Sequence, residues 1–478
     1  MESSKVLSYF SEICKIPRES GHEELIVKFL EQFAKERSLE YKIDKANNVL
    51  ISKKGSPGME NSPTVVLQSH SDMVCEKNSN SNHDFSKDPI KVIEENGWLI
   101  AKETTLGADC GIGIATQLAI LDNDTLVHGP IEALFTTDEE TGLTGAKAIK
   151  PGFITGNILI NLDSEDEGEL FIGCAGGIDT TAKFRYNKIS VPDGKEFMTV
   201  GFYGATGGHS GDDINKNRAN ANQLLVRFLI PIFEKYDISI CKIDGGNKRN
   251  AISREAWATL AFNPSDKDRI FNLFKKIEAE IMDEYSITDP DLYGKITSAQ
   301  PEKFFIDKDT ASRLLDAING CPHGVLAMSQ EIPGFVETST NLASIKMTTD
   351  GEIKVATSQR SSLNSARYYA ANRIESLFRL AGATVSHESE YPGWKPKMDS
   401  KLLAISKESY IELFGNEPVV RAIHAGLECG LFLDKYPNLD MISFGPTLKG
   451  VHAPGEKLEI ASVDKFWKLL LHILKKIQ

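Results

Sequence analysis

The chain has 478 residues, 41% of them hydrophobic and 25% charged, so it is long enough for two or three domains with sizeable cores. Its formal net charge of −13 argues against nucleic acid or an anionic membrane as the main partner, because both favour an excess of Lys and Arg. The seven cysteines are scattered and form no C-x-x-C motif, so we expect reduced thiols. The sequence shows no signal-peptide pattern and no apolar run approaching about 18 residues, so we expect a cytoplasmic protein.

The first part of the chain predicts helices followed by short buried strands. Apolar residues recur at helical spacing over residues 5–14 and 22–34. Further along, a helix is expected at 112–121, among apolar strands at 48–52, 64–68, 98–101, 131–136 and 158–162. Strands that are apolar on both faces and alternate with helices indicate an α/β domain with a mainly parallel sheet and helices on both faces.

The pattern changes near residues 180–200. Residues 180–186 and 195–202 alternate as half-exposed strands do, and amphipathic helices are expected at 217–233 and 365–380. A helix at 402–413, a strand at 439–444 and a helix at 463–477 then resume the first pattern. We therefore predict an α/β domain in two parts, residues 1–185 and 389–478, interrupted by an inserted α+β domain at 186–388.

Histidine or carboxylate side chains lie at the expected strand ends or just before the expected helix at 112–121. In open α/β sheets, binding sites lie beyond the carboxyl ends of the strands. The residues found there, and after the late strand, are His70, Asp109, the run Asp138-Glu139-Glu140, Asp163 and His452. We expect these separate segments to meet at one edge of the sheet.

Two histidines with several carboxylates suit Zn²⁺ or Mn²⁺ better than a thiolate site or an all-oxygen calcium site does. One carboxylate can bridge two ions in a co-catalytic hydrolase site. Because adjacent strand residues point in opposite directions, Glu139 and Glu140 are expected to divide two tasks, general base and metal ligand. Asp72, two residues after His70, is placed to orient a ligand imidazole.

Several motifs together resemble a known family. They are His70-x-Asp72, Gly107-Ala108-Asp109-x-Gly111, Asp138-Glu139-Glu140-x-Gly142, Asn161-Leu162-Asp163 and the late His452. Their order resembles the co-catalytic zinc peptidase family of carnosinases, aminoacylases and related carboxypeptidases, over essentially the full length. The stretches SDMVCEKN, GGHSG, RNAI and HAGLECG resemble more closely its bacterial-type aminoacyl-histidine (Xaa-His) dipeptidases.

The resemblance implies two metal ions per chain, zinc or alternatively Mn²⁺ or Co²⁺. It implies that one ion binds Asp109, Glu140 and His452, and that the other binds His70, Asp109 and Asp163. Asp109 would bridge the two ions, Glu139 would be the general base, and Asp72 would orient His70. The resemblance also implies a cis peptide bond between Asp109 and Cys110.

We expect the inserted domain to act as a lid over a dipeptide, or also to join two copies of the chain. It offers His209 in a glycine-rich turn as an oxyanion donor and Arg360 as a partner for the substrate carboxylate. The other candidate substrate-binding residues are Asn250, His424 and Glu428.

Other functions fit the sequence less well. Related amidohydrolases, such as tripeptidases, aminoacylases and carboxypeptidases, share these motifs. A nucleotide-binding oxidoreductase is indicated only by Gly111-x-Gly113 at a helix start, where Asp109 would place negative charge against a phosphate. A non-catalytic binding protein would be expected to have lost Glu139 or a ligand.

Overall fold

The computed structural model describes residues 3–478. The chain forms two compact units. The first runs to Gly173 and resumes at Trp394–Ala422 and Leu427–Gln478, and the second comprises Cys174–Gly393 and Ile423–Gly426. The second unit begins before the predicted boundary at residue 186, because β9 (Gly176–Arg185) is hydrogen-bonded within its sheet. Among the described residues, no helix has the length and apolar character that crossing a membrane requires.

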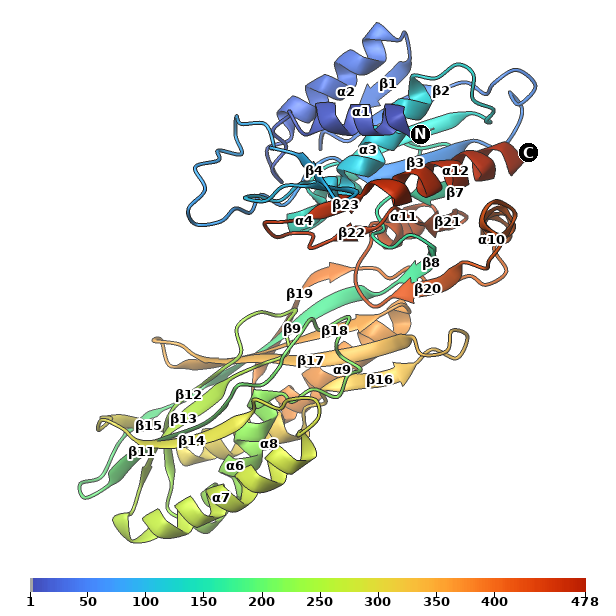
Figure 1. Cartoon of the computed structure of the whole chain (residues 1–478). Coiled ribbons are helices and arrows are strands. Elements are labelled where there is room, and N and C mark those ends of the chain that lie inside the picture. The colour runs from blue at the N-terminus through green and yellow to red at the C-terminus, as the bar shows by residue number, and fades with distance from the viewer. Residues whose placement is uncertain (1–2) are drawn as a thin grey trace. The chain divides into compact units, whose positions relative to one another are not determined.

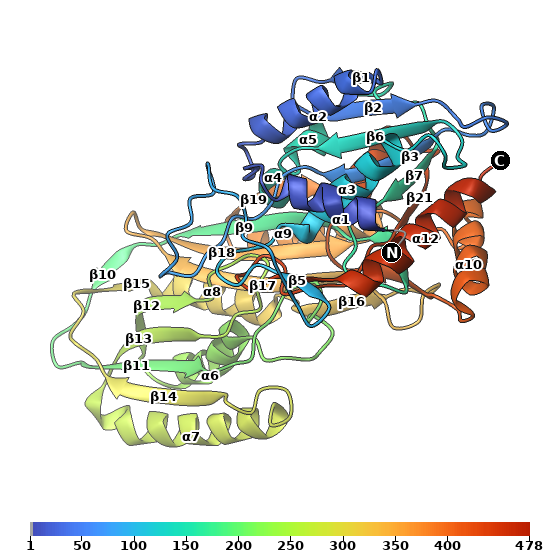
Figure 2. The same cartoon turned by 45° about the horizontal axis from the view of Figure 1, so that its top comes forward.

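The first unit contains an eight-stranded mixed sheet (Figures 1 and 2). The order of its strands is β1 (Glu40–Ile43), β2 (Val49–Lys53), β6 (Ile131–Thr136), β3 (Val65–His70), β7 (Ile158–Asn161), β21 (Asp440–Ser443), β8 (Glu169–Cys174) and β20 (Val419–Ile423). The central strands β6, β3, β7 and β21 are parallel, whereas β1, β2 and β8 pair in the antiparallel sense. The predicted parallel sheet is therefore confirmed at the centre, where β3 and β6 are buried along their whole length.

Helices complete this α/β unit. They are α1 (Ser4–Ile13), α2 (Glu24–Glu36), α3 (Ala108–Leu121), α4 (Glu139–Gly142), α5 (Thr144–Ala148), α10 (Lys401–Phe414), α11 (Cys429–Lys435) and α12 (Ile460–Lys476). α3 packs on β3 and against α1, while α10 packs on β21 and against α12. Gly113 allows the close approach of α3, since a Cβ there would come within 2.9 Å of the Ser69 Cβ on β3.

The expected strand at 98–101 is not part of the main sheet. It is β5 (Trp98–Ile100), in a four-stranded sheet of order β22 (Leu448–Lys449), β23 (Lys457–Glu459), β5 and β4 (Ile93–Glu95). The prediction was wrong on this point because the short apolar run is only half-buried, and nothing in its sequence separates it from a core strand. The small sheet nevertheless matters for the site, since β23 pairs with β5 and brings the chain after His452 beside the chain before Asp109.

The second unit is the predicted α+β insert. Its nine-stranded sheet has the order β14 (Tyr293–Ser298), β11 (Glu196–Tyr203), β13 (Ala256–Phe262), β12 (Ser239–Gly245), β17 (Val336–Met347), β18 (Glu352–Ser361), β9 and β19 (Thr384–Tyr391), with β16 (Gly324–Met328) beside β17. Its helices are α6 (Ala221–Lys235), α7 (Lys267–Glu284), α8 (Lys308–Gly320) and α9 (Asn364–Leu380). All four helices share one hydrophobic core with the strands, so they cover one face of the sheet (Figure 1).

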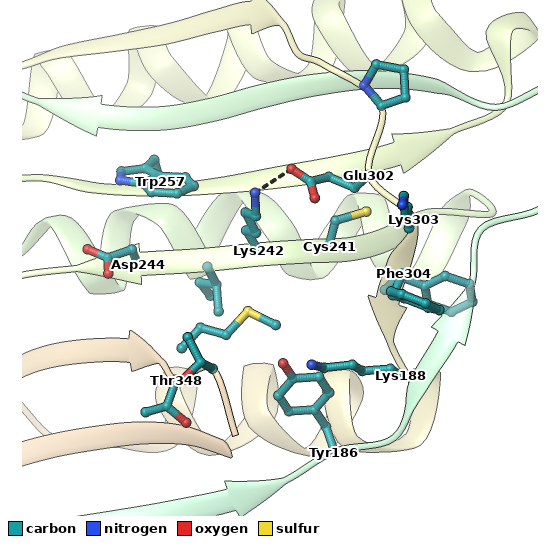
Figure 3. A pocket seen from close by; sticks show the side chains of 15 residues that line it. Tyr186, Lys188, Cys241, Lys242, Asp244, Trp257, Glu302, Lys303, Phe304 and Thr348 are labelled. Carbon is teal, nitrogen blue, oxygen red and sulfur yellow. Dashed lines mark hydrogen bonds and ion pairs between the residues drawn. The ribbon is translucent and has the colours of Figure 1, made fainter. Parts of the chain in front are cut away.

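A two-stranded antiparallel sheet, β10 (Lys188–Ser190) and β15 (Phe304–Ile306), packs through Phe305 against Cys241 of β12 and Ala261 of β13. Beside it is a pocket of about 570 Å³, which Figure 3 shows. Tyr186, Lys188, Trp257 and the ion pair of Lys242 with Glu302 are among the residues that line it. It contains none of the residues singled out from the sequence.

Candidate metal and catalytic site

The strand order of the first unit places the ligand-type residues at one edge. β3 lies between β6 and β7, and all three strands are parallel. His70 is the last residue of β3, the acidic run 138–140 follows β6, and Asp163 follows β7. Their carboxyl ends therefore meet, and the Asp109 and His452 turns lie at the same place.

Two groups of ligand atoms share Asp109. The Nε2 atom of His70 lies 3.0 Å from Asp109 Oδ1 and 3.3 Å from Asp163 Oδ1. The Nε2 atom of His452 lies 3.0 Å from Asp109 Oδ2 and 3.1 Å from Glu140 Oε1. Each carboxylate oxygen of Asp109 thus faces a different histidine and a different second carboxylate. Within each group, one ligand atom from every residue lies within 4.8 Å of the others.

The donor set fits divalent metal ions. It combines imidazole nitrogens with carboxylate oxygens, which separate segments bring within 3.0–3.3 Å of one another. Nitrogen and oxygen donors of this kind suit zinc and manganese. The neighbouring Cys110 is a poor candidate ligand, because burial raises the pKa of its thiol and its Sγ atom is hydrogen-bonded to the carbonyl of Leu162.

The charges of the ligand groups influence one another. Burial raises the pKa of Asp109, but the hydrogen bonds from His452 and His70 outweigh it and hold that pKa below its usual range. Burial and the neighbouring Asp109 raise the pKa of Asp163 to about 7. Hydrogen bonds to Asp109 and Glu140 raise the pKa of His452 to about 11. Concentrated negative charge is therefore the dominant electrostatic feature of this edge.

Asp72 connects two of the ligand segments. It is fully buried, and its Oδ1 atom lies 3.3 Å from His70 Nδ1. Its carboxylate also accepts hydrogen bonds from the backbone N–H groups of Glu139 and Glu140, at 3.1 and 3.2 Å. Burial raises the pKa of Asp72, but the hydrogen bond with His70 more than offsets this and lowers it to about 2.

The side chains of Glu139 and Glu140 are directed by the first turn of a helix and not by the alternation of a strand. Asp138 adopts a left-handed conformation with φ of 52°, and the two glutamates begin the short helix α4. An oxygen of each lies within 4.8 Å of a His70 nitrogen. Burial is the main cause of the raised pKa of Glu139, and the neighbouring acids Asp163, Glu428 and Glu140 add to it.

The start of α3 has an unusual backbone, with Asp109 and Cys110 outside the helical conformation. Gly107 has φ of 68°, where a residue with a Cβ is disfavoured, and that Cβ would also come within 2.6 Å of Arg18 Nη2. The peptide bond between Asp109 and Cys110 is cis, as predicted.

Three candidate substrate-binding residues lie in the second unit close enough to affect one another. The charges of His209, Arg360 and Asp212 all influence the pKa of His424, which burial lowers to about 3. His424 donates to or accepts from the Ser339 hydroxyl at 2.7 Å, and its Nδ1 atom has no hydrogen-bond partner in the described part of the chain. Asn250 is exposed and is adjacent to Ala251, which pairs with His209 through a β-bridge.

Glu428 lies in the first unit and is fully buried. Its Oε2 atom accepts hydrogen bonds from Gln68 Nε2 at 2.6 Å and from Thr136 Oγ1 at 2.7 Å, so it bridges β3 and β6. Burial raises its pKa to about 8. These contacts indicate that Glu428 holds β3 and β6 together next to the histidine–carboxylate groups, and they argue against a direct contact with substrate.

The sequence did not single out two buried charged residues that touch the Asp109 turn, Arg18 and Glu456. Each lies in a loop that follows no periodic pattern. Their partners are backbone atoms, so no motif identifies them.

Known proteins resemble this chain over almost its whole length. Residues 66–476 match the peptidase family M20/M25/M40. The "Cytosol non-specific dipeptidase" of Escherichia coli (strain K12) is 40% identical over 468 residues, which cover 98% of this chain and 96% of that protein. The crystal structure of the aminoacylhistidine dipeptidase from Vibrio alginolyticus is 40% identical, with a TM-score of 0.92 and coverage of 100% and 98%.

A more distant structure, the aminopeptidase PepT from Bacillus cereus ATCC 10987, shares the fold at 15% identity, with a TM-score of 0.58 and coverage of 99% and 98%. The extent of these matches, with the two histidine–carboxylate groups that meet at Asp109, shows that the chain belongs to the peptidase family M20/M25/M40.

Proposed function

We propose that this protein is a metal-dependent dipeptidase with two metal ions at the Asp109 edge. One observation above all supports this: the two oxygens of Asp109 face two separate histidine–carboxylate groups. Two full-length relatives that are 40% identical are named as dipeptidases, which favours a peptide substrate.

In this proposal, His70, Asp109 and Asp163 hold one ion, and Asp109, Glu140 and His452 hold the other. Zinc is the proposed ion, and Mn²⁺ or Co²⁺ would fit the same donors. When bound, such ions polarise a carbonyl and lower the pKa of a water molecule. Asp72 would fix the orientation of the His70 ring, since its carboxylate lies beside the Nδ1 atom.

Glu139 is the proposed general base. Its carboxylate lies within 4.8 Å of a His70 nitrogen but belongs to neither of the two histidine–carboxylate groups around Asp109, so this proposal leaves its lone pairs for a proton. It would take a proton from the attacking water and later give that proton to the leaving amine, while the amide bond breaks. Burial raises the pKa of Glu139, which makes its carboxylate a stronger base than an exposed one.

The second unit is proposed to supply the groups that recognise a dipeptide, and to act as a lid. Arg360 is suited to a carboxylate, because it is only 8% exposed and its buried Nε atom has no hydrogen-bond partner within residues 3–478. His209 is suited to an oxyanion, because the contacts of its Nδ1 atom with Gly211 and Asp212 leave the Nε2 atom to face a substrate. Asn250 and His424 are further candidates, whereas the buried contacts of Glu428 favour a supporting task.

The proposed substrates are dipeptides, with Xaa-His among a wider set, in the cytoplasm. The names of the two relatives differ on this point, since one is called non-specific and the other aminoacylhistidine dipeptidase. A tripeptidase, aminoacylase or carboxypeptidase is the alternative within the family. A nucleotide-binding oxidoreductase is disfavoured, because Gly111 and Gly113 are explained by close packing against Arg18 and Ser69.

A panel of free dipeptides, tripeptides and N-acetyl amino acids tests this proposal. The metal-free protein should be inactive and should recover activity with zinc or manganese. Asp109→Asn should lose metal and activity together, since both proposed ions share this residue. Hydrolysis that survives complete metal removal would exclude the proposal, and a preference for N-acetyl amino acids or tripeptides would replace the dipeptidase with an alternative.

A further inference from the structure

Two buried side chains of opposite charge contact the turn that carries Asp109, from different parts of the chain. Arg18 is 1% exposed and follows α1, and Glu456 is 2% exposed and lies between His452 and β23. Neither belongs to the groups of ligand atoms found in the described residues. A buried charge is unfavourable unless its hydrogen bonds are satisfied, so the partners of these two residues indicate what they do.

Glu456 binds the turn through four backbone N–H groups in succession. Its Oε2 atom accepts from the N–H groups of Leu106 and Gly107 at 2.7 and 2.9 Å. Its Oε1 atom accepts from those of Ala108 and Asp109 at 2.8 and 3.4 Å. Hydrogen bonds from N–H groups to a carboxylate are stronger than those between neutral groups. One side chain therefore fixes the backbone up to Asp109 itself.

Arg18 binds the same turn on its carbonyl side. Its Nη2 atom donates to the carbonyl oxygen of Gly107, and its Nη1 atom donates to those of Asp72 and Ser71 at 2.6 and 3.3 Å. The guanidinium thus joins the Asp109 turn to the segment that follows His70. Its fixed fork of donors suits two backbone segments at once, which a lysine cannot match.

We propose that Glu456 and Arg18 are positioning residues, which together hold the Asp109 turn in the geometry that the two metal ions require. This inference rests on the proposed function. Glu456 also follows His452 on the same loop, so it connects the two ligands of one group, while Arg18 connects Asp109 to the His70 segment of the other. Because Asp109 belongs to both groups, a displaced turn weakens both metal sites.

The test compares the affinity for Zn²⁺ alone, measured by competition with a chelator, in wild type and Glu456→Gln. A glutamine has nearly the same shape but turns one acceptor into a donor that faces backbone N–H groups. We expect its zinc affinity to fall about 10- to 100-fold, the usual effect of losing a partner that orients ligands. Activity should return toward the wild-type value as zinc is raised.

Glu132 provides a matched control. It is a buried carboxylate on β6 of the same unit, and it accepts hydrogen bonds from Thr155 N, Thr155 Oγ1 and Gly156 N, away from the ligand edge. Glu132→Gln should lower the thermal stability in a similar way but leave the zinc affinity unchanged. If both variants lose zinc affinity equally, Glu456 acts only through stability and the proposal fails.

Arg18→Lys keeps the positive charge but cannot join the two segments. We expect zinc affinity to fall about tenfold or more in this variant, and a wild-type affinity would overturn the proposal for Arg18. The outcomes also separate this inference from the proposed function. If wild type and Asp109→Asn bind zinc equally, the metal site itself is wrong, whereas a zinc-dependent wild type with unaffected Glu456→Gln refutes only the positioning residues.

Discussion

The Nη1 atom of Arg360 donates to the hydroxyl of Tyr391 at 3.2 Å, and the guanidinium forms no other hydrogen bond within residues 3–478. The Nε atom is buried without a hydrogen-bond partner, and no carboxylate lies within ion-pair distance of the guanidinium in this part of the chain. A buried, unpaired guanidinium is unfavourable unless an anion completes it. The relationship therefore indicates a place for the carboxylate of a substrate.

Arg360→Ala should mainly raise KM. The loss of a charged hydrogen bond costs about 1.5–3 kcal/mol, so we expect a rise of about 10- to 150-fold with a smaller change in kcat. A substrate with a C-terminal amide supplies the control. It should bind wild type weakly and be affected little by the substitution, because the interaction is already absent. Equal losses for the acid and the amide would show that Arg360 does not bind the carboxylate.

His209→Ala should lower kcat and leave zinc bound. The Nδ1 atom of His209 lies 3.3 Å from the backbone nitrogens of Gly211 and Asp212 and 3.4 Å from Asp212 Oδ2, which leaves Nε2 as the ring nitrogen that can face an oxyanion. Loss of one oxyanion donor lowers kcat by about 10²–10³ in a serine protease. His387→Ala, at an exposed position of the same unit, serves as the control. A KM effect alone would assign His209 to ground-state binding.

Glu139→Gln should separate catalysis from metal binding. We expect kcat to fall by about 10²–10⁴, the usual contribution of a general base, with both metals retained. Glu140→Gln should instead lose metal, because its Oε1 atom belongs to the group around His452. Metal content by elemental analysis and single-turnover rates measure the two effects. If both variants lose metal equally, the division of tasks between the two glutamates is wrong.

The central strands could be predicted from the sequence because they are buried on both faces without interruption. The ends of β3, β6 and β7 fall within one or two residues of the expected positions, and these ends determine where His70 and Asp163 lie. The short run at Trp98 could not be assigned to the right sheet, because its partner β23 lies more than three hundred residues later and pairing over that distance leaves no local pattern.

The arrangement of the site was harder to predict than its composition. Alternation along a strand was expected to separate Glu139 from Glu140, but the left-handed Asp138 ends the strand geometry and starts α4. Arg18 and Glu456 had no signal at all, because their partners are backbone atoms that only the folded loops bring together. A motif identifies side chains that bind metal or move a proton, because such residues are of few types. It does not identify side chains that only hydrogen-bond to distant backbone atoms.

Acid should destabilise the second unit through His323. Its Nδ1 atom accepts from the backbone N–H of Leu342 and from Asn220 Nδ2, both at 3.3 Å, and burial lowers its pKa to about 4. The unfolded chain has the ordinary pKa of about 6.5, so it binds more protons than the folded chain between about pH 6.5 and about pH 4. The contribution of His323 to the free energy of unfolding should therefore fall as the pH drops through this window and stay constant above it.

His323→Gln isolates this contribution. The slope that a single histidine adds is at most about 1.4 kcal/mol per pH unit, and the total over the window is about 3 kcal/mol. His424, with a pKa lowered to about 3, titrates in the same sense, so the variant should lose one histidine's share of the slope and retain the other. Denaturant titrations of wild type and variant at a series of pH values measure the difference. Parallel curves from pH 7 to pH 4 would mean that His323 titrates equally in the folded and unfolded chain, and that its buried contacts do not exclude the proton.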